Sequence, residues 1–156
     1  MKFIITLLVF LGLSANLNLA YAASSGGDSG SNLYKSGKKL VIKAKKLEEK
    51  NKIAKAEKLY LKALDKLEKA YDKDKKNADI LNYLGFALRK TGDFEKAEKF
   101  YLKGLELDAA HLGINEYLGE LYVETGRIEL AKERLQTLNG CKCEEYEELK
   151  ELIEKN

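Results

Sequence analysis

The chain has 156 residues and a formal net charge of +3, with 28 Lys and Arg against 25 Asp and Glu. It contains one His, two Cys and no Pro, and no Ser follows Ser36. With few nucleophiles and bases, no Gly-rich phosphate loop and no carboxylate pair in an apolar setting, this composition argues against an enzyme. We therefore predict no catalytic residue, no cofactor and no metal ion.

Residues 1–22 have the features of a cleavable secretory signal peptide. Lys2 precedes an apolar run over residues 3–13, and the segment ends on Ala20-Tyr21-Ala22, which fits an A-x-A cleavage site. The alternative is an uncleaved anchor, but the apolar run is shorter than the roughly 20 residues that span a bilayer. We expect cleavage after Ala22 and a periplasmic or secreted protein.

Residues 23–33 include the sequence SSGGDSGSN, which is nearly free of apolar side chains. Such a segment buries too little surface to offset its ordering entropy, so we predict a flexible Ser/Gly linker. From Tyr34 onward the chain is rich in Lys, Glu, Leu and Ala, which favour helices.

The remaining chain is built from an internal repeat. YLGFALRKTG at 83–92 returns 34 residues later as YLGELYVETG, and KAEKLYLKAL at 55–64 matches KAEKFYLKGL at 96–105 with an offset of 41. The seven extra residues equal about two helical turns, so the second helix of the first unit can be longer without rotating its apolar face. We predict units at 34–77, 78–111 and 112–143.

Each unit is predicted to be a helical hairpin. Its two amphipathic stretches are separated by a short break at Asn51, Gly92 or Gly126, which are residue types that adopt the left-handed conformation at helix ends. Small residues fall where two helices of a hairpin must approach closely; these are Gly85, Gly119, Ala97 and Ala131, with Ala44 and Ala56 in the first unit. Residues 144–156, with Tyr146, Leu149, Leu152 and Ile153 on one face, are predicted to be a capping helix.

This pattern resembles the tetratricopeptide repeat. The second unit matches the family at Leu81, Leu84, Gly85, Leu88, Gly92, Ala97 and Tyr101, and the third at Leu118, Gly119, Tyr122, Gly126, Ala131 and Leu135. The resemblance implies an all-α, right-handed α-solenoid of about three hairpins plus the capping helix, and the chain is most similar in kind to small exported bacterial members. The alternative is a bundle of amphipathic helices without true repeats.

In this family the first helix of each unit lines a concave groove. The register then places the following residues in that groove: Lys38, Val41, Lys45, Asp79, Asn82, Phe86, Arg89, Glu116, Glu120 and Val123. Phe86 is interpreted either as an exposed anchor for a peptide or as a residue that packs against a neighbouring hairpin. Some family members grip a C-terminal carboxylate with Lys and Asn, but the corresponding positions here carry Val41, Tyr83, Gly113 and Tyr117, and Lys45 alone fits.

The resemblance implies a non-enzymatic interaction scaffold in the periplasm that binds a peptide or helix of a cell-envelope protein, or a second copy of itself. Residues 35–62 hold eleven Lys and three Glu, whereas residues 144–156 hold six Glu and two Lys, so a bipolar segment fits such a groove. Nucleic acid is not expected as the partner of an exported protein. The alternative for the basic end is contact with an anionic membrane surface.

Cys141 and Cys143 are the only cysteines, and they are separated by Lys142. In an oxidising compartment they are candidates for a local disulfide, with unpaired structural thiols and metal or redox work as alternatives. A thiol- or metal-handling protein is therefore the second functional hypothesis. The single histidine, His111, lies 30 residues upstream at a junction between units and is interpreted as structural.

Overall fold

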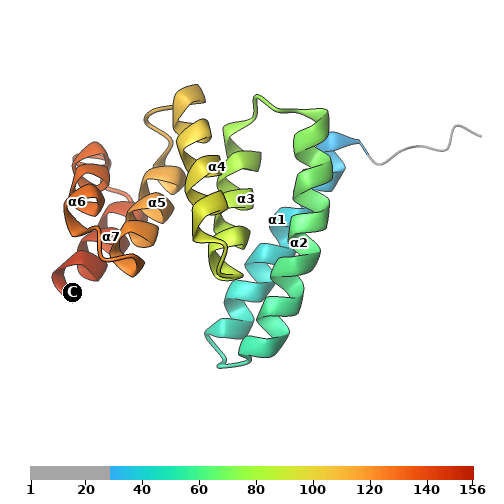
Figure 1. Cartoon of the computed structure of the whole chain (residues 1–156), viewed down its shortest axis with the longest axis horizontal. Helices are drawn as coiled ribbons and strands as arrows, with labels where there is room; N and C mark the ends of the chain where they lie inside the picture. Colours follow the sequence, from blue (N-terminus) through green and yellow to red (C-terminus); the bar gives the residue numbers. More distant parts are fainter. Residues whose placement is uncertain (1–28) are drawn as a thin grey trace, which may run out of the picture.

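The computed structural model describes residues 29–156, and the predicted signal peptide lies outside this range. The described part forms seven α-helices and no strand, which confirms the predicted all-α class (Figure 1). The helices are α1 (Gly30–Glu48), α2 (Ile53–Lys73), α3 (Ala78–Lys90), α4 (Phe94–Leu107), α5 (Leu112–Glu124), α6 (Ile128–Thr137) and α7 (Glu144–Glu154).

The first helix begins four residues before the predicted boundary. Ser29 caps α1, because its Oγ accepts a hydrogen bond from the backbone N–H of Asn32 at 3.3 Å. Leu33 is 6% exposed and joins the core. This cap and the burial of Leu33 offset the poor helix propensity of Gly30. The linker prediction is therefore wrong for residues 30–33, and residues 23–28 lie outside the described part.

Three pairs of helices form hairpins at the predicted turns. Asn51, Gly92 and Gly126 have φ values of 54°, 88° and 73°, so each adopts the left-handed conformation that ends a helix. The helices on either side of each turn then pack against each other, which gives the pairs α1–α2, α3–α4 and α5–α6.

The first hairpin is longer than the others. Helix α2 has 21 residues and α4 has 14, a difference of seven. This difference accounts for the 41-residue offset between the first and second units. Because seven residues make about two turns, Leu67 and Ala70 in the longer part of α2 lie on the same buried side as Ala63, and all three are 0% exposed.

The hairpins stack side by side in chain order, from α1–α2 at one end to α6 and α7 at the other (Figure 1). Two groups of buried residues fill the interior, and Leu64, Phe100 and Tyr117 pack against both groups. The core therefore runs continuously through the stack as in an α-solenoid. Among the described helices, none combines the length and the apolar character that a membrane span needs.

Gly85 and Gly119 both mark close approaches, but to different elements. A Cβ atom on Gly85 would lie 2.5 Å from the ring of Tyr101, in the second helix of the same hairpin. A Cβ on Gly119 would lie 2.5 Å from Leu149 of α7. We expected the neighbour of Gly119 to be its own hairpin helix. That expectation is wrong because α7, as well as α6, packs against α5, and Leu149 of α7 is the side chain nearest to Gly119.

Candidate functional site

The inner face of the solenoid is formed by α1, α3 and α5, which carry the predicted groove residues, and by α7, which packs against α5. Most of these side chains are too buried to contact a ligand. Val41, Asn82, Phe86, Arg89, Glu116 and Val123 are buried, Lys38, Lys45 and Glu120 are half-buried, and Asp79 is exposed. The predicted set is therefore mainly the floor of the face, and only four members border solvent.

Phe86 belongs to that floor. Its side chain is 3% exposed, and its ring centroid lies 4.6 Å from that of Tyr117 and 6.0 Å from that of Tyr60 in α2. Of the two interpretations of Phe86, packing against neighbouring hairpins is the one that the structure supports. The half-buried rings of Tyr83 and Tyr117 lie nearer the surface and offer the aromatic faces instead.

Arg89 links α3 to α5 from a buried position. Its guanidinium nitrogens donate to Glu120 and, at 2.5 Å, to Glu124. Burial by itself lowers the pKa of Arg89, but the neighbouring Tyr101, Glu120 and Glu124 together raise it by a larger amount. The net shift of the pKa is therefore upward, and Arg89 keeps its positive charge. Arg89 is thus already occupied by two carboxylates of this chain and serves to hold neighbouring hairpins together.

An acidic cluster lies beside Arg89. Carboxylate oxygens of Glu116, Glu120 and Glu148 lie within 4.8 Å of one another. Burial, a hydrogen bond to Glu148 and the negative charges of Glu120 and Glu148 together raise the pKa of Glu116 to about 9, although Lys45 opposes this shift. Glu116 is therefore protonated at neutral pH. Oxygen clusters of this type suit hard divalent cations, but Arg89 and the Glu116 proton already reduce the negative charge here.

Lys45 connects the basic and acidic ends of the inner face. Its Nζ lies 5.5 Å from the ring centroids of both Phe86 and Tyr117. A small pocket of about 130 Å³ separates it from α7 and is lined by Lys45, Glu116, Tyr117, Glu144, Glu145 and Glu148. The sequence places Lys45 and Glu116 on this face, but it does not reveal that the first turns of α7 border the same site.

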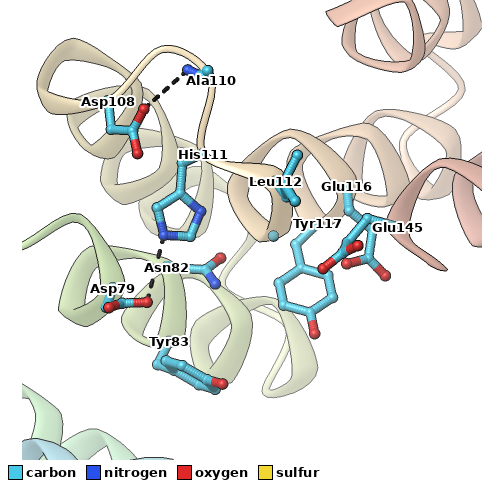
Figure 2. A pocket seen from close by; sticks show the side chains of 11 residues that line it. Asp79, Asn82, Tyr83, Asp108, Ala110, His111, Leu112, Glu116, Tyr117 and Glu145 are labelled. Atoms are coloured by element: carbon cyan, nitrogen blue, oxygen red, sulfur yellow. Dashed lines mark hydrogen bonds and ion pairs between the residues drawn. The ribbon is translucent and has the colours of Figure 1, made fainter. Parts of the chain in front are cut away.

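A larger pocket of about 420 Å³ lies between the first turns of α3 and α5 (Figure 2). His111 forms one wall and caps α5, because its Nδ1 accepts from the backbone N–H of Ile114 at 3.2 Å. Its Nε2 lies 3.5 Å from Asp79 Oδ1. Asp108 accepts from the backbone N–H of Ala110 at 3.1 Å and so shapes the loop before α5. His111 is structural, as the sequence suggests, yet it also lines a pocket.

Asn82 lies at the base of this pocket. Its side chain is 5% exposed, and its Oδ1 has no hydrogen-bond donor among the described residues. Opposite it, a Cβ atom on Gly113 would come within 2.9 Å of Asn82 Nδ2. Gly113 therefore leaves room for the amide. Sequence reasoning identified Asn82 as a groove residue but could not show that its carbonyl oxygen is unpaired.

Comparison with known proteins finds a family match for part of the chain and a shared fold for most of it. A tetratricopeptide repeat model matches residues 47–110. Among solved structures, the second such domain of human RPAP3 in complex with the HSP70 peptide SGPTIEEVD is similar with a TM-score of 0.59 and 17% identity, over 82% of this chain and 100% of that chain. Residues 47–110 therefore match the tetratricopeptide repeat family, and the described part of the chain shares the fold of the RPAP3 domain.

Two further solved structures share this fold. The Arabidopsis OM64 TPR domain has a TM-score of 0.52 and 14% identity over 79% of this chain and 98% of that chain. The Yersinia enterocolitica type III secretion translocator chaperone SycD has a TM-score of 0.55 and 16% identity over 82% of this chain and 92% of that chain. No curated protein sequence matches significantly.

The two cysteines lie in the turn between α6 and α7. Their sulfur atoms meet at bonding distance, and the Cα atoms of Cys141 and Cys143 are 5.2 Å apart, within the roughly 4.4–6.8 Å that a disulfide requires. Gly140 and Lys142 have positive φ values of 88° and 50° and form the tight turn around them. The possible metal-ligating group found in residues 29–156 consists of glutamates and includes neither cysteine.

Proposed function

We propose that the inner face of α1, α3, α5 and α7 binds a segment of another protein, and that the chain is a non-enzymatic interaction scaffold. The observation that carries this proposal is the arrangement of Tyr83 and Tyr117 between groups of opposite charge. Lys38 and Lys45 lie on the α1 side, and the carboxyl groups of α5 and α7 lie on the other. Aromatic residues beside complementary charges are typical of protein-binding surfaces.

The charge pattern favours a bipolar ligand. An acidic residue of the ligand would lie near Lys38 and Lys45, and a basic residue would lie near α7. The RPAP3 domain with the same fold is in complex with SGPTIEEVD, which supports a peptide as the kind of ligand. An acidic C-terminus is not the ligand we propose here, because Tyr83, Gly113 and Tyr117 occupy positions where some family members carry Lys or Asn.

Capture of partners from the native cell envelope, followed by measured affinities for the purified partner, tests this proposal. Tyr83→Ala and Lys45→Glu are each expected to weaken binding at least fivefold, since both side chains are half-buried on the inner face. Lys58→Glu, which reverses an exposed charge on α2, is the matched control and is expected to leave affinity unchanged. Equal retention of every partner by all three variants would contradict the assignment of the inner face.

We further propose that the chain is exported through residues 1–22 and meets its partner in the cell envelope. The sequence pattern of Lys2, the apolar run and Ala20-Tyr21-Ala22 supports this location. Fractionation of the producing cells and N-terminal sequencing of the purified protein test it. We expect a mature chain that starts at Ala23, and a full-length chain retained in the cytoplasm would contradict export.

A second candidate function is thiol or metal handling by Cys141 and Cys143, which the contact between their sulfurs favours. We propose instead that the pair is a local brace for the α6–α7 turn. Because the loop that it closes is so short, its effect on stability is small. Intact mass before and after reduction, with metal analysis, separates the two. An oxidised pair without metal agrees with the brace, and stoichiometric metal agrees with the alternative.

A further inference from the structure

We infer that the pocket between the first turns of α3 and α5 receives a lysine or arginine side chain of the bound segment. This inference rests on the proposed function, because it names one residue class within that ligand. The pocket has a volume of about 420 Å³, and its walls come from α3, α5, the loop before α5 and the first turn of α7 (Figure 2).

Among residues 29–156, no Lys or Arg forms an ion pair with the acidic groups of this pocket. These carboxyl groups are Asp79, Asp108, Glu116 and Glu145. Asp79 pairs with His111, and Lys45 lies near Glu116 without forming an ion pair. In a chain with 28 basic residues, such an unneutralised set favours a cationic ligand.

The positive ends of nearby helices account for only part of this negative charge. Asp79 and Glu145 lie in the first turns of α3 and α7, and α5 begins beside the pocket. Each helix N-terminus carries about half a positive elementary charge. Even with Glu116 protonated, the other three carboxylates exceed the charge of these three helix ends. The helix ends alone therefore do not neutralise the pocket, and Lys38 and Lys45 at the rings of Tyr83 and Tyr117 add positive charge from the α1 side.

The unpaired Oδ1 of Asn82 is an independent sign of a missing hydrogen-bond donor. Asn82 is 5% exposed, lines the pocket, and lies in Figure 2 between His111 and Tyr117. A buried acceptor without a partner is unfavourable, so a ligand that brings N–H groups relieves it. Lysine offers three such donors and arginine five, whereas an acidic or aliphatic residue offers none on its side chain.

The remaining walls suit the stem of a long basic side chain. Leu112 is 40% exposed, and the rings of Tyr83 and Tyr117 line the pocket beside it. Methylene groups of Lys and Arg pack on such surfaces, while their charged ends are attracted to aromatic faces. The same two rings already attract ammonium groups from α1, since Lys38 Nζ lies 5.2 Å from the Tyr83 centroid and Lys45 Nζ 5.5 Å from that of Tyr117.

An NMR titration of the ¹⁵N-labelled mature protein tests the inference with three small probes. Nα-acetyl-arginine amide and Nα-acetyl-lysine amide carry the cation, and Nα-acetyl-norleucine amide is the uncharged control. We expect the cationic probes to shift the Asn82 side-chain amide and the backbone amides of Gly113 and Tyr117, with a Kd of about 1 to 10 mM. The norleucine probe is expected to bind at least tenfold more weakly.

Matched variants assign the effect to the pocket. Glu145→Gln and Asp79→Asn each remove a carboxylate that lines the pocket. Each is expected to raise the Kd of the cationic probes at least threefold. Glu106→Gln, at an exposed site on α4 outside the pocket, is the control and is expected to leave the Kd unchanged.

Three results would overturn the inference. These are equal shifts with the norleucine probe, unchanged affinity in both pocket variants, or shifts of the pocket amides by Ca²⁺ or spermidine but not by the amino acid probes.

A separate outcome concerns the ligand as a whole. If an inner-face peptide tolerates replacement of every basic residue by Ala, the pocket inference fails while the scaffold stands. If the probes titrate but no protein segment binds, the proposed function fails.

Discussion

Glu116 is 3% exposed on the inner face, and Glu148 and Glu120 are its carboxyl neighbours there. Burial first, and then these neighbours, raise its pKa to about 9. In the unfolded chain the same group ionises near its ordinary pKa of about 4.3. Between these values the folded state holds a proton that the unfolded state has released. The contribution of Glu116 to stability is therefore complete at acid pH and is lost as the pH rises toward 9.

Glu116→Gln, which resembles the protonated form at every pH, tests this account. We expect its unfolding free energy to equal that of the parent near pH 4.5 and to exceed it by about 2 kcal/mol at pH 8, after allowance for relaxation of the site. Urea unfolding at several pH values measures the difference. A variant that is equally stable or less stable than the parent at pH 8 would show that Glu116 ionises normally.

At the scale of the helices, close packing depends on two glycines that face different neighbours. Gly85 meets the fully buried ring of Tyr101, which has no room to move. Gly119 meets the Leu149 side chain, which is also fully buried but is smaller than a tyrosine ring and has other rotamers. In both helices Ala would also gain up to about 1 kcal/mol of helix propensity over Gly. The same substitution is therefore expected to differ in cost at these two equivalent repeat positions.

Gly85→Ala is expected to destabilise the protein by about 1 to 3 kcal/mol, because overpacking against Tyr101 outweighs the gain in propensity. Gly119→Ala is expected to stay within about 1 kcal/mol of the parent, because Leu149 can adjust. Thermal or urea unfolding of the two variants provides the comparison. Equal costs would mean that α7 fixes Leu149 as firmly as α4 fixes Tyr101.

The helices and hairpins could be predicted from sequence because their signals are local. The turns that end the first helices lie within single units, at the positive-φ residues Asn51, Gly92 and Gly126. The 34-residue spacing of the units can be read directly from the sequence. The start of α1 was misplaced because the burial of Leu33, a tertiary effect, outweighs a Ser/Gly composition. Likewise, the neighbour of Gly119 depends on how α7 packs against α5, a tertiary contact that no repeat pattern records.

The site was predicted less completely because its chemistry depends on contacts between units. Arg89 could be placed on the inner face by register, but its partners Glu120 and Glu124 are 31 and 35 residues away. From sequence alone Phe86 could be exposed or buried, because its burial depends on the rings of Tyr60 and Tyr117, which come from other helices. The sequence assigns the carboxyl groups of α7 to a cap, and their place beside Lys45 follows from the packing of α7 against α5.

For the whole molecule, the separation of basic and acidic ends in sequence becomes a separation across one face. Lysines of α1 face carboxyl groups of α5 and α7 over the rings of Tyr83 and Tyr117. Such complementarity sets the direction in which a bipolar segment binds and accelerates its association. Because exposed charges are screened by salt, partner association is expected to slow as ionic strength rises.

Site-specific photo-crosslinking in the native cell envelope tests the central claim most directly. The photoreactive residue is placed at Tyr83 on the inner face or, as the control, at Leu102, which is 44% exposed on α4. We predict a discrete crosslinked partner at position 83 and none at position 102, with the yield at 83 reduced by Lys45→Glu. Equal or stronger crosslinking at position 102 would contradict binding on the inner face.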